Sequence, residues 1–210
     1  MPFSSVLGAS SVIKPGVCTS TTRPSVPYAG QLIYETDTSK VASWNGSAWV
    51  YTATGAMVLI KTQAIGTGVA SVAVTNVFSS TYDSYLVDVS GSSGNGSQVG
   101  LQIGAAATGY YGGGIYISNA GTVTGYGNNN TTTFNKILHE TDGQGFGLQI
   151  QIMNPNLAKR TIVVATGSPA GTGNYFAGGL ADANLYTGFT LTTTGTLTGG
   201  EIRIYGYARS

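Results

Sequence analysis

Short runs of β-branched and aromatic residues alternate with glycine-rich turns over most of this 210-residue chain. Branched side chains pack well on a pleated surface and lose rotamer freedom in a helix, so these runs favour strands. Residues 147–152, Gly-Leu-Gln-Ile-Gln-Ile, alternate apolar and polar side chains as a half-buried strand does. Glycine occurs 32 times and only 8% of the residues are charged, against a usual charged share of about 25%. The sequence therefore predicts an all-β fold.

The composition also narrows the classes of function. Hydrophobic residues make up 41% of the chain, which is enough to bury a core. The net charge is +1 and no basic cluster is present, so we expect no nucleic-acid partner. The longest apolar run, residues 56–60, is far shorter than the roughly 20 residues of a membrane span. Cys18 and His139 are the only residues of their kinds, which excludes an intrachain disulfide and a multi-histidine zinc site, and we expect no cofactor.

Shifts in composition divide the chain into three segments. Residues 1–27 contain four prolines in a Ser/Thr/Gly-rich stretch without periodic apolar residues, and are expected to form an extended arm. This arm is either a disordered tail or a segment that becomes ordered against a larger assembly. Residues 28–55 are expected to form a small β-meander, and residues 56–210 a jelly-roll-like antiparallel β-sandwich.

The meander is expected to contain three strands, at residues 31–37, 41–44 and 48–52. Asn45-Gly46 predicts a two-residue type I′ turn between the last two strands. Trp44 and Trp49 flank this turn, where they can meet across the ladder. A unit this small cannot hold a core alone. We therefore expect Tyr34, Trp44 and Trp49 to pack in a collar built from copies of the unit around a symmetry axis.

The third segment is a series of short strands separated by turn-forming residues, without a repeat period that would indicate a propeller or solenoid. Eight or more short strands over about 150 residues favour a jelly roll. The glycine-rich stretches 109–114 and 125–133 are interpreted as loops. The expected strands are 57–63, 69–78, 85–90, 99–104, 114–118, 134–140, 146–153, 160–166, 175–180, 189–194 and 201–207.

Four stretches carry a resemblance to a known group of proteins. Residues 27–38, Pro-Tyr-Ala-Gly-Gln-Leu-Ile-Tyr-Glu-Thr-Asp-Thr, and residues 44–50, Trp-Asn-Gly-Ser-Ala-Trp-Val, resemble a short module of bacteriophage tail fibres and minor tail proteins. Residues 78–87, Phe-Ser-Ser-Thr-Tyr-Asp-Ser-Tyr-Leu-Val, are similar to the early strands of phage β-sandwich domains. Residues 199–207, Gly-Gly-Glu-Ile-Arg-Ile-Tyr-Gly-Tyr, are similar to the closing strand of such domains.

The resemblance implies a structural protein of a phage particle, made in the host cytoplasm and carried on the outside of the tail or capsid. The leading interpretation is a tail fibre or receptor-binding component that is attached to other virion proteins through residues 1–27 and forms a homotrimer. A capsid decoration or head-fibre protein is the alternative, since it would also combine an arm with a β-sandwich. The low charge of the chain is consistent with faces that neighbouring subunits cover, because interface cores are poor in charged residues.

Four tyrosines, Tyr110, Tyr111, Tyr116 and Tyr126, bracket the glycine-rich loops of the third segment. Tyrosine offers a large amphipathic contact area with few rotamers to freeze. We interpret Tyr110, Tyr111 and Tyr126 as candidates for recognising a host surface glycan or protein. Alternatively, these side chains pack loop against loop, and Tyr116, which alternates with isoleucines, is part of the core.

Two groups of ionisable residues are candidates for catalysis, because phage tail proteins also cut polysaccharides and glycoside hydrolysis needs two carboxylates. Glu35 and Asp37 lie two residues apart on one strand, and His139 precedes Glu140 and Asp142 before a glycine. Both patterns are more typical of strand ends that enter turns. We therefore expect no enzyme and no catalytic residue, with a polysaccharide-degrading activity as the minor alternative.

Calcium is the metal that the loops are best suited to hold. Asp182-Ala183-Asn184 offers alternating oxygen donors, as the start of a calcium loop does, but the rest of such a loop is missing. We therefore expect no metal site.

Overall fold

The structure is a computed structural model that describes residues 15–51, 57–94, 96–139, 143–169 and 171–207. Every regular element in these residues is a β-strand, as the composition predicts. None of the described residues form a helix long and apolar enough to span a bilayer. The chain divides into two compact units, Met1–Thr54 and Gly55–Ser210.

The small unit is built on a four-stranded sheet. Its strands, in spatial order, are β1 (Gly16–Cys18), β2 (Leu32–Glu35), β3 (Lys40–Trp44) and β4 (Trp49–Tyr51). β2, β3 and β4 form the predicted antiparallel meander, and Trp44 pairs directly with Trp49. The two indole rings lie 5.5 Å apart between centroids, which confirms that they meet across the ladder.

β1 lies inside the segment that the sequence predicts as an extended arm. Residues 1–14 of that arm are outside the described part of the chain, but residues 16–18 pair in parallel with β2. β1 is the edge of this sheet, and an edge strand needs hydrogen bonds on one side only, so a short segment between prolines can supply it. The boundary predicted at residue 27 therefore does not separate arm from sheet.

The connection between β3 and β4 differs from the predicted two-residue turn. Because Trp44 pairs with Trp49, residues 45–48 all lie between the strands. Gly46 has a φ of 103°, but Asn45 does not adopt the positive φ that a type I′ turn requires of it. The Asn45 side chain instead accepts hydrogen bonds from the N–H groups of Ser47 and Ala48 at 2.9 and 2.8 Å. These bonds stabilise a longer loop.

The two faces of the small sheet differ in character. Ile33, Glu35 and Ala42 share one face and are buried. Successive residues of a strand point to opposite faces. The other face therefore carries Val17, Leu32, Tyr34, Val41, Ser43 and Val50. Among residues 15–51, Ile33 and Ala42 are the only buried hydrophobic residues, so this part of the chain has very little apolar interior.

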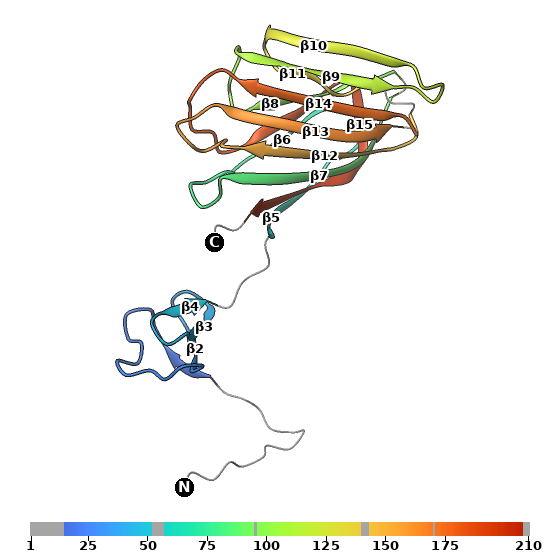
Figure 1. Ribbon diagram of the computed structural model, residues 1–210. Coiled ribbons are helices and arrows are strands. Elements are labelled where there is room, and N and C mark those ends of the chain that lie inside the picture. Colours follow the sequence, from blue (N-terminus) through green and yellow to red (C-terminus); the bar gives the residue numbers. More distant parts are fainter. Residues whose placement is uncertain (1–14, 52–56, 95, 140–142, 170, 208–210) are drawn as a thin grey trace. The chain divides into compact units, whose positions relative to one another are not determined.

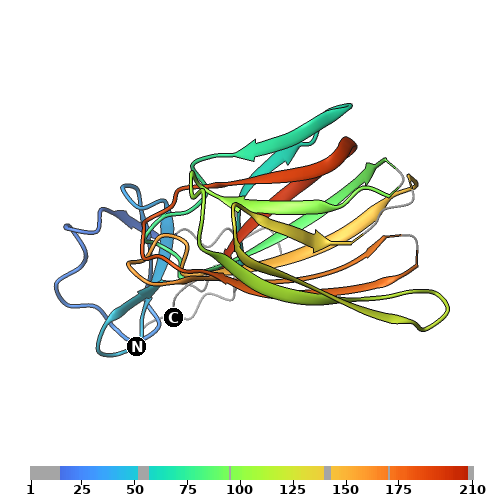
Figure 2. The same cartoon turned by 90° about the horizontal axis from the view of Figure 1, so that it is seen from above.

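The large unit consists of two layers of antiparallel strands (Figures 1 and 2). In Figure 1, β10, β9, β14, β13, β12 and β7 lie side by side in one layer, with β6, β8 and β11 behind them. The first layer contains, in order, β5 (Met57–Ala64), the second half of β15 (Phe189–Tyr207), β7 (Ser84–Ser93), β12 (Phe146–Met153), β13 (Thr161–Pro169), β14 (Gly173–Leu180), β9 (Tyr110–Ile117) and β10 (Val123–Thr131). The second contains β6 (Val69–Val74), the first half of β15, β8 (Val99–Ile103) and β11 (Phe134–Leu138).

β15 connects the two layers. Residues 189–193 pair with β6 and β8, whereas residues 201–207 pair with β5 and β7. Between these halves, Gly199 and Gly200 have φ values of 64° and 83°. A Cβ at Gly200 would overlap the carbonyl oxygen of Ser90, so only glycine fits there. Because hydrogen bonding continues through β15, the two layers form one nearly closed sheet, which is consistent with the predicted all-β sandwich.

The core lies between the layers. β12 buries every second residue, as its alternating sequence predicts. Tyr110, Phe134 and Phe176 continue the core with edge-to-face contacts, at centroid distances of 4.8 Å and 5.4 Å from Phe134. Such contacts add about 0.5–1.5 kcal/mol per pair beyond the burial of apolar area.

Part of the glycine-rich middle region forms strands where the sequence predicts loops. Residues 110–113 begin β9, and residues 123–131 form β10. A Cβ at Gly112 or at Gly178 of the neighbouring strand would come within 2.9 Å of the Phe176 ring. Glycine stands at positions 112 and 178 because the Phe176 ring leaves no room for a side chain there, and this packing overrides its low strand propensity.

Candidate functional site

The tyrosines that the sequence singles out do not form one surface. Tyr110 points inward from β9 and is fully buried. Its hydroxyl accepts a hydrogen bond from the Ile103 N–H at 2.8 Å and lies 3.3 Å from the carbonyl oxygens of Ile103 and Ala106. Burial raises the pKa of Tyr110 to about 12. Tyr110 is a core residue, and its assignment to surface recognition is wrong.

Tyr111, the next residue of β9, points outward and is 41% exposed. Ile115 and Ile117 share its face, and Tyr175 of β14 pairs with Ile115 on that face. All four side chains are exposed. Tyr111 therefore remains a candidate for recognition, but on an apolar sheet face and not in a loop.

The rings of Tyr116 and Tyr126 both contact the His139 ring beside β14. The His139 ring lies 4.7 Å from the Tyr116 ring and 5.4 Å from the Tyr126 ring, between centroids. The Tyr126 hydroxyl donates to Asn174 Oδ1 at 3.0 Å, and Asn174 Nδ2 donates to the carbonyl of Ile137 at 2.8 Å. Burial is the main reason why the pKa of Tyr126 is raised. These contacts hold Tyr126 half-buried, so its side chain is mainly a packing element.

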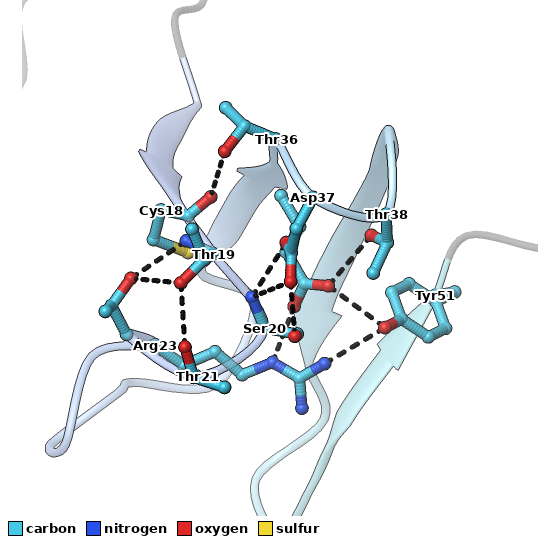
Figure 3. A network of polar contacts seen from close by, with 11 residues as sticks. Cys18, Thr19, Ser20, Thr21, Arg23, Thr36, Asp37, Thr38 and Tyr51 are labelled. Carbon is cyan, nitrogen blue, oxygen red and sulfur yellow. Dashed lines mark hydrogen bonds and ion pairs between the residues drawn. The ribbon is translucent and has the colours of Figure 1, made fainter.

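Within the described residues, the ionisable side chains that are candidates for glycoside hydrolysis do not form a pair of carboxylates facing one another. Of His139, Glu140 and Asp142, only His139 lies within the described residues, and it is buried against the Tyr116 and Tyr126 rings. Glu35 and Asp37 are engaged in separate contacts with residues 18–23 (Figure 3).

Glu35 is the centre of a polar network on the small sheet. Its side chain is fully buried, and Arg23 Nε donates to Glu35 Oε1 at 2.5 Å. The hydroxyls of Thr38 and Tyr51 both donate to Oε2 at 3.0 Å (Figure 3). The hydrogen bond from Arg23 is the main reason why the pKa of Glu35 lies below its usual 4.5. Four segments of the unit therefore meet at one carboxylate.

Arg23 belongs to the loop between β1 and β2, and Asp37 fastens this loop at a second point. Both of its carboxylate oxygens accept hydrogen bonds from the Ser20 N–H, at 2.9 and 3.0 Å, and the Ser20 hydroxyl also donates to it. The hydroxyl contact is the main reason why the pKa of Asp37 lies below its usual 3.8. The Thr36 N–H donates to the Cys18 carbonyl at 2.9 Å beside this contact. Glu35 and Asp37 are thus structural residues here.

The three residues expected in a collar lie on different faces of the small sheet. Tyr34 pairs with Val41, whereas Trp44 pairs with Trp49, and residues 41 and 44 of one strand point to opposite faces. One surface therefore cannot use all three. Tyr34 shares its face with the exposed side chains of Leu32 and Val50.

A hollow of about 320 Å³ lies between two loops of the large unit, where the sequence suggested only a weak calcium motif. Its lining residues are Ala105, Ala106, Ala107, Thr108, Asp182, Asn184 and Tyr186. The two loops are separated by more than 70 residues in sequence, so no local pattern brings them together. No group of three or more His, Cys, Asp or Glu side chains suited to a metal occurs in the described part of the chain.

The fold defines an all-β protein with two sheet-based units. A scan against protein-family models finds no match, and a search of curated proteins finds no similar sequence.

Proposed function

We propose that this chain is a structural component of a bacteriophage tail, of the fibre or receptor-binding kind, and that it assembles as a homotrimer. The observation that carries the proposal is the small sheet, in which the two stretches that resemble the phage tail module supply β2, the end of β3 and most of β4. Residues of those stretches make the contacts that shape it: Glu35 and Asp37 fasten the preceding loop, Trp44 contacts Trp49, and Asn45 caps the turn. The resemblance thus extends over residues with a structural role.

Self-association is supported by the exposed face of the small sheet. Val17, Leu32 and Val50 are 70%, 41% and 45% exposed on this face. The face carries no charged side chain among the described residues. Copies of an uncharged apolar face can meet around a symmetry axis without placing like charges together. A unit with so small an interior gains the apolar burial that it lacks from such an assembly.

The outer face of the first layer of the large unit has a similar character. Leu59, Tyr205, Leu86 and Val164 lie in one row across neighbouring strands, with Gln151 between the last two.

The charges beside this row are largely balanced. Arg203 forms an ion pair with Asp88, at 3.9 Å, and also with Glu201. An apolar row with internally paired charges suits contacts between subunits of a fibre head.

The test is the position of the protein on the particle. An antiserum raised against the purified chain is used to label particles of the phage that encodes it, for negative-stain electron microscopy. We expect label at the tail. Label on the head would overturn the tail assignment in favour of a capsid decoration protein. If particles that have been opened with denaturant also carry no label, the chain is not a virion protein.

A further inference from the structure

We propose that the hollow between residues 104–109 and 181–188 binds a neutral sugar residue of a surface glycan, through Asp182 and Asn184. This inference rests on the proposed function in one respect, namely that the glycan belongs to the host. The chemistry of the hollow itself is independent of where the protein sits on the particle.

Backbone hydrogen bonds hold the two loops together. The Gly104 N–H donates to the Gly188 carbonyl at 2.9 Å, and the Ala181 N–H donates to the Gly109 carbonyl at 2.8 Å. These bonds lie at the two ends of the loop that runs from residue 104 to residue 109. The hollow is therefore framed by fixed backbone.

Tyr186 forms a rigid wall of the hollow. Its N–H donates to the Pro155 carbonyl, and its own carbonyl accepts from Asn156 Nδ2, both at 2.8 Å. Its ring lies against Gly104, where any Cβ would overlap it. A wall that is already ordered loses little conformational entropy when a ligand binds.

The polar groups of the hollow present hydrogen-bond acceptors. Asp182 Oδ2 accepts from the Tyr186 hydroxyl at 2.5 Å and from Asn184 Nδ2 at 3.1 Å, so the orientation of the carboxylate is fixed. Among the described residues, Asp182 Oδ1 accepts only from the Asn184 N–H, at 3.3 Å, and keeps capacity for a further donor. No described residue donates to the amide oxygen of Asn184. Two neighbouring acceptors on a fixed frame match a pair of adjacent sugar hydroxyls.

The rest of the lining selects for a neutral, partly apolar ligand. Ala105, Ala106 and Ala107 line the hollow and offer an apolar wall for the C–H face of a sugar ring, and the Thr108 hydroxyl can both donate and accept. Of the described residues that line the hollow, Asp182 alone is charged, so an anionic sugar would meet a negative charge without a cation to balance it. The volume of about 320 Å³ lies at the lower end of the roughly 300–1,000 Å³ typical of small-molecule sites.

A bound cation is the less suitable occupant. Calcium takes six to eight oxygen ligands, usually with several carboxylates. Here one oxygen of the single carboxylate is already occupied by two donors. The hydroxyl groups of a sugar, in contrast, can each donate to a single acceptor and need no such set of ligands.

The test is saturation-transfer NMR on the full chain. The probes are glucose, galactose, mannose and N-acetylglucosamine, with glucuronic acid and N-acetylneuraminic acid as anionic comparators. We expect signal transfer to at least one neutral sugar and weaker transfer to both acids. Asp182→Asn is expected to bind that sugar about tenfold more weakly, because a hydrogen bond to a charged acceptor becomes one to a neutral acceptor.

Two further variants separate binding from folding. Ala107→Trp fills the hollow from an exposed position without removing a polar group, and is expected to abolish transfer. Asp88→Asn makes the same change as Asp182→Asn on the outer sheet face, where it is expected to leave binding unchanged. Near-ultraviolet circular dichroism verifies that each variant is folded.

The inference is overturned if none of the six sugars receives signal, if the acids bind better than the neutral sugars, or if transfer persists in a folded Ala107→Trp variant. None of these outcomes alters where the antiserum labels the particle. Failure of the sugar site and failure of the tail assignment are therefore distinguishable.

Discussion

Arg23 Nε donates to the fully buried carboxylate of Glu35 at 2.5 Å, which ties the loop after β1 to the sheet that follows it (Figure 3). The two residues come from segments that the sequence predicts as separate parts, an arm and a meander. Their contact explains how a unit with only two buried hydrophobic residues among residues 15–51 holds one face closed.

Replacing Arg23 with methionine is expected to destabilise the small unit, because the buried Glu35 carboxylate would lose its cation and keep only hydroxyl donors. Trp44 and Trp49 are the only tryptophans of the chain and both lie in this unit, so tryptophan fluorescence follows its unfolding separately from the sandwich. We expect a lower urea midpoint for R23M. Arg160→Met, at an exposed site of the large unit, is the control and should leave the midpoint unchanged.

Acid is expected to weaken the same unit. The folded-state pKa values of Glu35 and Asp37 lie below their usual 4.5 and 3.8, through hydrogen bonds from Arg23 and Ser20 respectively. The folded unit therefore favours the ionised carboxylates. Their contribution to stability is complete at pH values above the usual pKa values, and it is lost as the pH falls through the lowered pKa values of the folded state. The urea midpoint by tryptophan fluorescence should fall in this range. The double variant Glu35→Gln, Asp37→Asn should show a much flatter acid response, and an equally steep one would contradict the assignment.

Gly200→Ala is expected to destabilise the large unit by about 3 kcal/mol or more, since a Cβ there overlaps the Ser90 carbonyl at a φ of 83°. Urea unfolding followed by far-ultraviolet circular dichroism measures the effect. Gly147→Ala is the matched control, because a Cβ at Gly147 meets nothing within 4 Å. That change is expected to stay within about 0.5 kcal/mol of the native chain. Equal stability of the two variants would rule out the steric account of how β15 passes between the layers.

Val50→Asp is expected to dissociate the proposed homotrimer. The substitution places one negative charge per chain on the exposed apolar face of the small sheet, where copies of that face would bring the charges together. Size-exclusion chromatography with light scattering should give about three times 21.4 kDa for the native chain and 21.4 kDa for the variant. Thr21→Asp, on the loop that covers the other face, is the control. A folded native chain that stays monomeric at all concentrations would disprove the trimer.

Local sequence was sufficient for the fold class and for most strand positions. Alternation along residues 146–153 predicts β12 and its buried face, and the β-branched runs predict most of the other strands. The Trp44–Trp49 pair was also predictable, because the two residues flank one short connection. These features depend on propensity and on the period of two, which a short window of sequence contains.

The tertiary structure alone decided the rest. Residues 110–113 and β10 form strands although their glycines by themselves predict loops, and at Gly112 the Phe176 ring of the neighbouring strand leaves no room for a side chain. Tyr110 lies in the core and Tyr111 on the surface because successive residues of β9 point to opposite faces of the sheet. The Arg23–Glu35 ion pair joins residues 12 apart across a turn, and the hollow at Asp182 combines two loops that are far apart in the chain. Which groups meet at such places depends on hydrogen bonding and packing between distant segments, and no local pattern in the sequence contains that information.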